Sequence, residues 1–135
     1  MTPKIALDTN AYRALDDGEP EVANYLRSTL KVGLPIIVLG EIYHGIFLGS
    51  RQEENNTKLN KFISLSRVEI LHVNKSTTKL FGEIAAELKR IGKPMQQNDL
   101  WIAALCKQYD YALLSADKGF SNITGLELIS FNKPE

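Results

Sequence analysis

The chain has 135 residues, of which 44% are hydrophobic and 24% are charged. This length is typical of one domain whose core needs no disulfide or structural metal, so we expect residues 1–135 to form a single domain. The 16 basic residues balance the 16 acidic ones, and net charge therefore argues neither for nor against a nucleic-acid partner.

A short apolar strand near the start of the chain ends abruptly on polar residues. Residues 5–7 predict a buried strand, and Asp8 and Asn10 follow at the point where the strand gives way to a helix. In open α/β sheets, ligands bind at this carboxyl edge of the strands. The polar residues after this strand are therefore the first candidates for a functional site.

The rest of the first half alternates helical and strand-like patterns. A short helix follows Asn10, and residues 21–30 predict a second helix because their apolar positions recur at helical spacing. Residues 36–39 are apolar throughout, which predicts a strand covered by helices on both faces. Glu41 is then expected to open a helix. The polar sequence SRQEENNTK predicts a surface turn, which leads into a helix from about residue 54 to 66.

The second half continues the alternation. Residues 68–73 have the composition of a strand, and Ser76 or Thr77 is expected to cap the next helix, which Gly92 ends. The helix expected over residues 99–109 is apolar on nearly all sides, which is typical of a central, buried helix. The remaining predicted elements are strands over residues 111–114 and 126–131, separated by a single helical turn over residues 117–120.

This alternation predicts the α/β fold class, with a five-stranded parallel sheet sandwiched between helices. Right-handed crossovers place every strand-to-helix junction at the same edge of such a sheet. Asp8, Glu41 and Asp117 are therefore expected at one rim. Asp99 can join them if the amino end of its helix points to that rim.

Compartment signals in the sequence are few and agree with one another. The N-terminal stretch lacks the basic flank and long apolar core of a signal peptide, and no apolar run approaches the length of a membrane span. The only cysteine, Cys106, lies in the apolar run LWIAALC, which excludes a disulfide framework and is compatible with a reducing compartment. We expect a cytoplasmic protein with no membrane partner.

Each of the four acids has an ordinary structural explanation. An acidic residue at a helix cap or in the first turn stabilises the helix by about 0.5 to 2 kcal/mol without any function. Asp99 fits this explanation least, because Asn98 already offers a cap and the helix that follows is apolar nearly all round. A carboxylate in that position lies close to the core.

Four ionised carboxylates at one rim need a cation. At about 5 Å and an effective dielectric constant near 20, each pair repels by roughly 3 kcal/mol, whereas a whole domain is stable by only about 5 to 15 kcal/mol. Either some of the acids are protonated or a metal binds. A site made only of oxygen ligands suits Mg²⁺ or Mn²⁺ rather than zinc. Such a site activates water for in-line displacement at phosphorus.

The same residues resemble a known family. The acids in LDTN (Asp8), GEI (Glu41), NDLWIAA (Asp99) and LLSADKGF (Asp117) are similar, in order and context, to the acidic quartet of the PIN domain. The resemblance covers essentially the whole chain, because the closing GLELISF is also similar to the last strand of that family. Length and layout most resemble the small single-domain ribonuclease toxins of bacterial VapBC toxin–antitoxin pairs.

This resemblance implies a five-stranded parallel sheet between helices, a Mg²⁺ or Mn²⁺ cofactor, an RNA substrate and cleavage that leaves a 5′-phosphate. It also implies a homodimer and a cognate antitoxin that covers the acidic cleft. Asn10 would orient Asp8 or contact substrate, and Ser115, where the family often has Thr, would be a supporting hydroxyl. By position, the catalytic and metal-binding acids would be Asp8, Glu41, Asp99 and Asp117. We expect helices 22–30 and 41–47 to form the antitoxin groove.

Other residues could contribute to RNA binding. Trp101 and Phe120 could stack on bases, although the apolar neighbours of Trp101 favour core packing for it. Three cations flank the acids and could hold phosphates, although such residues usually form a solvated surface. These cations are Arg13, Lys93 and Lys118.

Other functions compete with this interpretation. A haloacid-dehalogenase-type phosphohydrolase needs a second aspartate two positions after the first, where this chain has Asn10, and a receiver domain wants adjacent acids after its first strand. A PIN-like module that binds RNA or protein without cutting is the strongest rival from another class, because fold does not imply function. Within the enzyme class, an RNA-processing nuclease that is not a toxin stays open.

Overall fold

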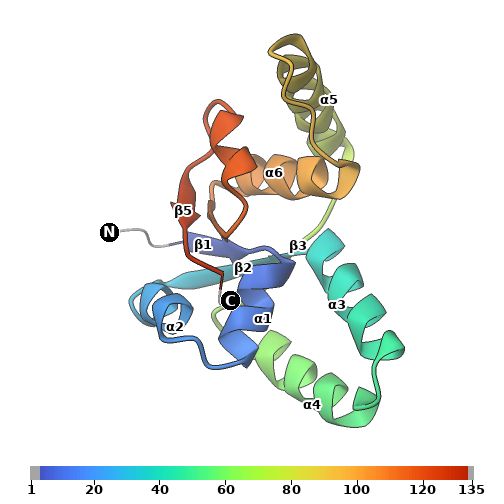
Figure 1. Cartoon of the computed structure of the whole chain (residues 1–135), viewed down its shortest axis with the longest axis vertical. Coiled ribbons are helices and arrows are strands. Elements are labelled where there is room, and N and C mark those ends of the chain that lie inside the picture. The colour runs from blue at the N-terminus through green and yellow to red at the C-terminus, as the bar shows by residue number, and fades with distance from the viewer. Residues whose placement is uncertain (1–3, 134–135) are drawn as a thin grey trace.

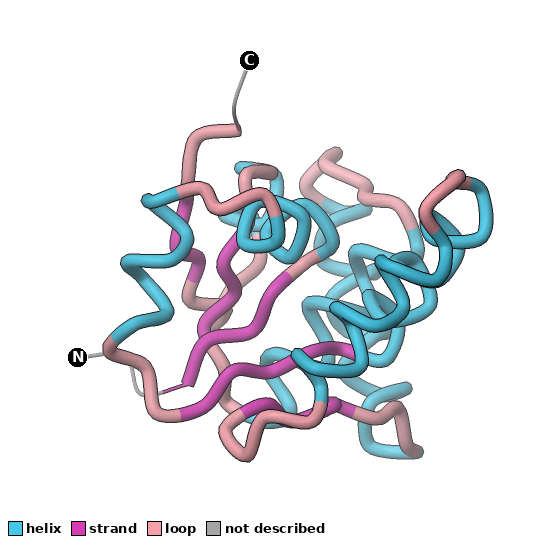
Figure 2. The backbone as a smooth tube through the Cα atoms, turned by 90° about the horizontal axis from the view of Figure 1, so that it is seen from below, coloured by secondary structure: helices cyan, strands magenta, loops and turns pink. Residues whose placement is uncertain are grey.

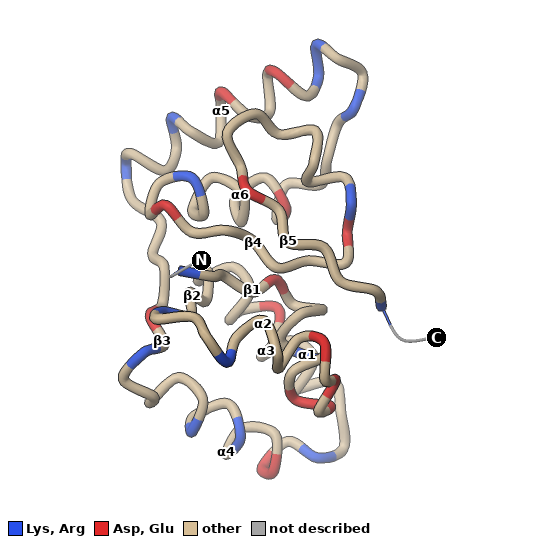
Figure 3. Tube along the Cα trace, turned by 90° about the vertical axis from the view of Figure 1, so that its left-hand side faces the viewer, with Lys and Arg blue, Asp and Glu red and all other residues tan. Residues whose placement is uncertain are grey.

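Five parallel strands form one sheet in the order β3-β2-β1-β4-β5. A computed structural model describes residues 4–133, and Figure 2 shows its strands side by side. Figures 1 and 3 show helices α1 to α4 on one side of the sheet and α5 and α6 on the other. The predicted α/β fold class, with a five-stranded parallel sheet between helices, is confirmed. The strands are β1 (Lys4–Leu7), β2 (Lys31–Pro35), β3 (Val68–Leu71), β4 (Ala112–Ser115) and β5 (Leu128–Ser130).

The helices follow from the connections between these strands. From β1 the chain passes to β2 and β3 at one edge of the sheet, and it then crosses back past β1 to β4 and β5 at the other edge. Right-handed crossovers in these two directions place α1 to α4 on one face and α5 and α6 on the other. None of the helices in residues 4–133 is long and apolar enough to cross a membrane. The helices are α1 (Thr9–Asp16), α2 (Pro20–Arg27), α3 (Ile36–Leu48), α4 (Gln52–Ile63), α5 (Lys75–Arg90) and α6 (Gln97–Tyr109), with a 3₁₀ turn η1 (Lys118–Asn122).

The second strand differs from the prediction. Residues 36–39 form the first turn of α3, whereas the strand is the preceding segment Lys31–Pro35. Pro35 lies at the strand-to-helix junction, where its missing N–H costs neither element a hydrogen bond. Four consecutive apolar residues fit a strand or a helix pressed onto a sheet equally well. As a consequence, Glu41 lies in the second turn of α3 rather than at its start.

Two helix starts also differ from the prediction. The segment SRQEENNTK is not a turn, because α4 begins within it at Gln52 and presents its polar residues to solvent. Helix α5 is capped by Asn74 rather than by Ser76 or Thr77. The Asn74 side chain accepts the Thr77 N–H, and the Thr77 hydroxyl accepts the Asn74 N–H at 2.9 Å. Thr77 is therefore the third residue of a capping box.

The core lies on both faces of the sheet, under α1 to α4 on one face and under α5 and α6 on the other, and α6 is buried over most of its length. Leu113 and Leu114 of β4 and Leu105 of α6 have no exposed surface, and neither has Cys106. Burial raises the pKa of the Cys106 thiol above its ordinary value. The free thiol is therefore a packed core group, as the sequence predicted.

Gly33 of β2 has no room for a side chain. A Cβ there would lie 2.8 Å from the ring of Tyr111, which is buried and held by a 2.8 Å hydrogen bond from its hydroxyl to Glu69. We expect Gly33→Ala to lower the free energy of unfolding by about 1 to 3 kcal/mol through overpacking. Gly82→Ala is the matched control, since a Cβ on this exposed α5 residue meets nothing within 4 Å. It should stabilise by up to about 1 kcal/mol.

Urea unfolding followed by circular dichroism measures the free energy of unfolding of both Gly→Ala variants and of the wild type. Equal midpoints for Gly33→Ala and the wild type would show that the Tyr111 ring yields to the methyl group at no cost.

Candidate active site at the carboxyl edge of the sheet

The site lies at the switch point of the sheet. The connection after β1 leads to β2 on one side, whereas the connection after β4 leads to β5 on the other, so the ends of β1 and β4 diverge. Such divergence opens a crevice at the carboxyl edge of a parallel sheet. Asp8 directly follows β1, and Asp117 follows β4 by two residues.

Asp8 is the most constrained of the four acids. It caps α1, with one carboxylate oxygen accepting the Ala11 N–H at 2.8 Å and the other accepting the Ser115 hydroxyl. Only 7% of Asp8 is exposed. Burial is the main cause that raises its pKa; the two hydrogen bonds oppose this rise, whereas the charges of Asp117 and Glu41 add to it.

Ser115, the last residue of β4, connects two of the acids. Its side chain is fully buried. The hydroxyl donates to Asp8 and accepts the backbone N–H of Asp117 at 3.0 Å. The exposed Asp117 carboxylate in turn caps η1 by accepting the Gly119 N–H at 2.8 Å. One hydroxyl therefore fixes the ends of β1 and β4 relative to each other.

Glu41 reaches the site from α3 and contacts two other helices. One carboxylate oxygen accepts the Thr9 hydroxyl of α1 at 2.6 Å, and the other accepts the Asn98 side-chain amide of α6 at 3.5 Å. Neither Thr9 nor Asn98 was predicted from the sequence to be a site residue. Asn98 is also not the cap of α6, because Gln96 occupies that position and α6 has no side-chain cap. The sequence offered one signal for both residues, because each directly adjoins an acid: Thr9 follows Asp8, and Asn98 precedes Asp99.

Asp99 lies in the first turn of α6 and is half-buried. Because α6 runs antiparallel to the β4 strand that follows it, its amino end lies at the same edge as Asp8 and Asp117. Burial, as the largest cause, and the charges of Asp117, Glu41 and Asp8 together raise the pKa of Asp99 to about 6. Asp99 therefore senses the other three acids electrostatically.

Within residues 4–133, no basic side chain forms an ion pair with any of these four acids. The only ion pairs within residues 4–133 join Lys58 to Asp16 and to Glu54, on the outer helices. A concentration of carboxylates without Lys or Arg partners is the donor chemistry that suits a hard divalent cation. Within the same described residues, no three His, Cys, Asp or Glu side chains are gathered closely enough to form a metal shell in this structure. The donor type fits Mg²⁺ or Mn²⁺, and binding would have to draw the carboxylates together.

The remaining predicted contributors lie in different environments. Asn10 is half-buried in the first turn of α1, and its side chain makes no hydrogen bond with the described residues; Asp8 is oriented by Ala11 and Ser115 instead. Phe120 is 1% exposed and belongs to the core, so it offers no face to a base. Trp101 packs on Phe81 with ring centroids 4.1 Å apart, as its apolar neighbours predicted.

Comparison with known proteins identifies the family of the chain. Residues 5–126 match the PIN domain family. Ribonuclease VapC2 of Rickettsia felis is 32% identical over 103 residues, which cover 76% of this chain and 75% of the relative. Ribonuclease VapC1 of Haemophilus influenzae is 29% identical over 132 residues, covering 94% and 97% of the two chains.

Solved structures with the same fold come from toxin–antitoxin complexes. The structure of VapBC2 from Rickettsia felis, bound to a DNA fragment from its promoter, superposes with a TM-score of 0.83 at 28% identity and covers 95% of this chain and 98% of the other. VapBC-1 from nontypeable Haemophilus influenzae superposes with a TM-score of 0.82 at 27% identity, covering 93% and 96%.

Proposed function

The chain belongs to the PIN-domain family, and on this premise we propose that it is a metal-dependent endoribonuclease and the toxin of a toxin–antitoxin pair. Its family membership, predicted from the acidic motifs, is confirmed by the match over residues 5–126. The observation that carries the proposed activity is a set of four carboxylates at the switch point of the sheet, none of which has an ion-pair partner in the part of the chain that the structure describes. The similar ribonucleases support RNA as the substrate.

Each residue of the proposed site has a distinct task. Mg²⁺ or Mn²⁺ held by Asp8, Glu41, Asp99 and Asp117 would supply an activated water and positive charge for the leaving oxygen. Ser115 and the Ala11 N–H hold the two oxygens of Asp8, which fixes the direction of their free lone pairs. Thr9 holds Glu41 against α1 in the same way.

Asp99 limits the repulsion within the site when no cation is bound. With a pKa of about 6, it takes up a proton in weakly acidic solution and so removes one of four like charges. A bound cation favours the ionised form. Cation binding near pH 6 is therefore expected to release a proton from the protein.

An antitoxin partner is a further part of the proposal, supported by the VapBC complexes among the structural neighbours. An apolar cavity of about 340 Å³ lies between α1, α2, α4 and the β2–β3 edge, and its rim includes the half-exposed Leu65. This cavity combines α2 with α1 and α4, whereas the groove expected from the sequence lay between helices 22–30 and 41–47. We propose that an apolar antitoxin segment binds here.

The proposed homodimer needs an apolar surface of its own. Phe47 and Leu48 at the end of α3 are 67% and 76% exposed and offer such a surface.

RNA cleavage that depends on a divalent cation is the expected result for the purified protein. Mixed cellular RNA incubated with Mg²⁺ or Mn²⁺ should be cut, and a chelator should stop the reaction. The products should carry 5′-phosphate ends, which a 5′-phosphate-dependent exonuclease detects. Ends with a 2′,3′-cyclic phosphate would instead show attack by the ribose hydroxyl and contradict the proposal.

Thermal melting with and without the cation separates the proposed nuclease from its rival. Mg²⁺ should raise the melting temperature, because a ligand that binds only the folded state stabilises it. No cutting together with no cation effect on melting would favour a module that binds RNA or protein without cutting.

A further inference from the structure

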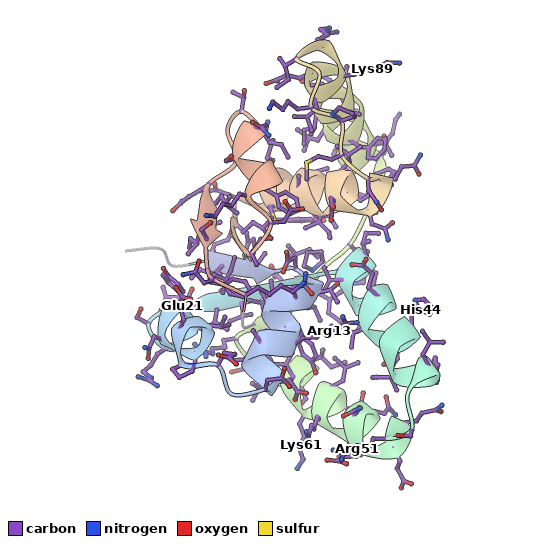
Figure 4. All side chains as sticks on the ribbon, in the orientation of Figure 1. Arg13, Glu21, His44, Arg51, Lys61 and Lys89 are labelled. Atoms are coloured by element: carbon purple, nitrogen blue, oxygen red, sulfur yellow. The ribbon has the colours of Figure 1, made fainter. Side chains whose placement is uncertain are left out.

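Arg13 of α1 lies over a glycine of α3, one helical turn away from the acids. Thr9 and Glu41 join the two helices by a hydrogen bond, and four residues further along each helix are Arg13 and Gly45. One turn advances a helix by about 5.4 Å. A Cβ on Gly45 would lie 3.1 Å from a terminal nitrogen of the Arg13 guanidinium. Figure 4 shows Arg13 on α1, on the side toward α3, and His44 on the outer side of α3.

The guanidinium of Arg13 has no partner among the described residues. It is exposed, and it forms neither a hydrogen bond nor an ion pair within residues 4–133. It is also not among the charges that shift the pKa of Asp8 or Asp99. Arg13 is therefore not a counter-ion of the acids, and its hydrogen-bond donors are available to an external anion.

The surroundings of Arg13 form a small polar hollow. A cavity of about 290 Å³ brings Arg13 together with the amide of Asn55 and the carboxylate of Asp16. The charge of Asp16 is partly offset by Lys58, whose ammonium lies 3.9 Å from it. The hollow therefore presents an arginine fork and an amide to a ligand, next to the rim that carries Glu41.

We propose that Arg13 binds an RNA phosphate beside the one that is cleaved, and that Gly45 provides the room for its guanidinium. This inference rests on the proposed nuclease function. The four acids repel an RNA strand that approaches them. A positively charged side chain one helical turn away therefore helps to hold the RNA backbone in place at the site. The guanidinium suits this task because its fork matches two oxygens of one phosphate. Arg13 is thus a positioning residue.

Loss of Arg13 should weaken RNA binding more than it slows chemistry. Arg13→Gln is expected to raise KM about tenfold, the value of one charge-assisted hydrogen bond, and to leave kcat within about twofold. Lys61→Gln on α4 is the matched control, because Lys61 is an exposed cation without an ion pair to a described residue and lies away from the acids (Figure 4). It should leave both constants unchanged.

Salt dependence gives a readout that a general structural defect would not reproduce. A short fluorescent single-stranded RNA of mixed sequence is titrated with protein that also carries Asp99→Asn, so that the RNA stays intact. The slope of log K against log salt should fall by about 0.7 in Arg13→Gln, which corresponds to one lost phosphate contact. Arg13→Lys should keep the slope. Gly45→Ala, which keeps the charge but displaces the guanidinium, should weaken binding in the same direction as Arg13→Gln.

The outcomes separate this inference from the proposed function. If the wild type cuts RNA and Arg13→Gln matches Lys61→Gln in KM and salt slope, Arg13 holds no phosphate and the inference fails alone. If the wild type neither binds nor cuts RNA, the nuclease function and the inference fail together.

Discussion

Asp99→Asn is expected to reduce RNA cleavage by about 100- to 1,000-fold and yet to stabilise the protein when no divalent cation is present. The two effects have one cause. Asp99 is half-buried beside three other carboxylates, which raise its pKa together with burial to about 6. Its charge is costly to the fold and is kept, on our proposal, because a cation needs it.

The sign of the stability effect follows from the shift in pKa. The pKa of Asp99 is about 6 in the folded protein against an ordinary value of 3.8, so between these values the folded state holds more protons than the unfolded state. Stability is therefore lost as the pH rises through this window, and the loss is complete above it. Asparagine removes the charge, so the gain at pH 8 should be about 1 to 2 kcal/mol after discounting for solvent screening. At pH 4, close to the lower of the two values, most of the gain should be lost.

Thermal and urea unfolding at pH 4 and pH 8 in chelator measure this gain. Asp110→Asn is the matched control at the opposite end of α6, since Asp110 is exposed and has a left-handed backbone (φ 60) that asparagine also adopts. Added Mg²⁺ should reverse the order of the melting temperatures, because only the wild type retains all four proposed ligands. An Asp99→Asn variant that still cuts RNA at the wild-type rate would remove Asp99 from the catalytic set.

Ser115→Ala is expected to lower cleavage by about 10- to 100-fold without removing any of the four acids, as losses of residues that orient metal ligands do. The change frees one oxygen of Asp8 and leaves the Asp117 N–H without its acceptor. Because the lost hydrogen bond favours the ionised carboxylate, the pKa of Asp8 should rise further. The acidic limb of the activity profile should then move to higher pH.

Kinetics against pH and Mg²⁺ concentration test the role of Ser115. Ser115→Thr is the matched variant, since it retains the hydroxyl at a fully buried position. It should keep most of the activity and the wild-type pH profile. A threonine variant as impaired as the alanine variant, with both folded by circular dichroism, would point to packing at the end of β4 instead of a hydrogen bond to Asp8.

Much of the fold could be predicted because local patterns and topology rules agree. The strands that precede Asp8 and Asp117 are short apolar runs followed by polar residues, and the structure has strands at both positions. The error at residues 36–39 has a physical reason, because a helix that covers a sheet can be as apolar as a strand inside it. Glu41 was expected at the right rim, but it reaches that rim from the second turn of α3.

The contacts that orient the acids could not be predicted in the same way. Thr9 and Asn98 meet Glu41 across 32 and 57 residues of sequence, respectively. Such contacts depend on how α1, α3 and α6 cross, which neither propensity nor periodicity specifies. The four acids as a catalytic set stay a prediction, and the Asp99 and Ser115 variants are its direct tests.

The strand order also has a consequence for the time at which the protein becomes active. Asp8 precedes its partner Ser115 by 107 residues, and Ser115 lies on β4, which pairs with β1 in the middle of the sheet. Domains generally fold as units, and the crevice between the ends of β1 and β4 is incomplete until β4 has been made. A nascent chain therefore carries no assembled site until β4 has been translated and has paired with β1. On the proposed function, the chain is therefore inert toward RNA until the segment that carries Ser115 and Asp117 has been made and folded.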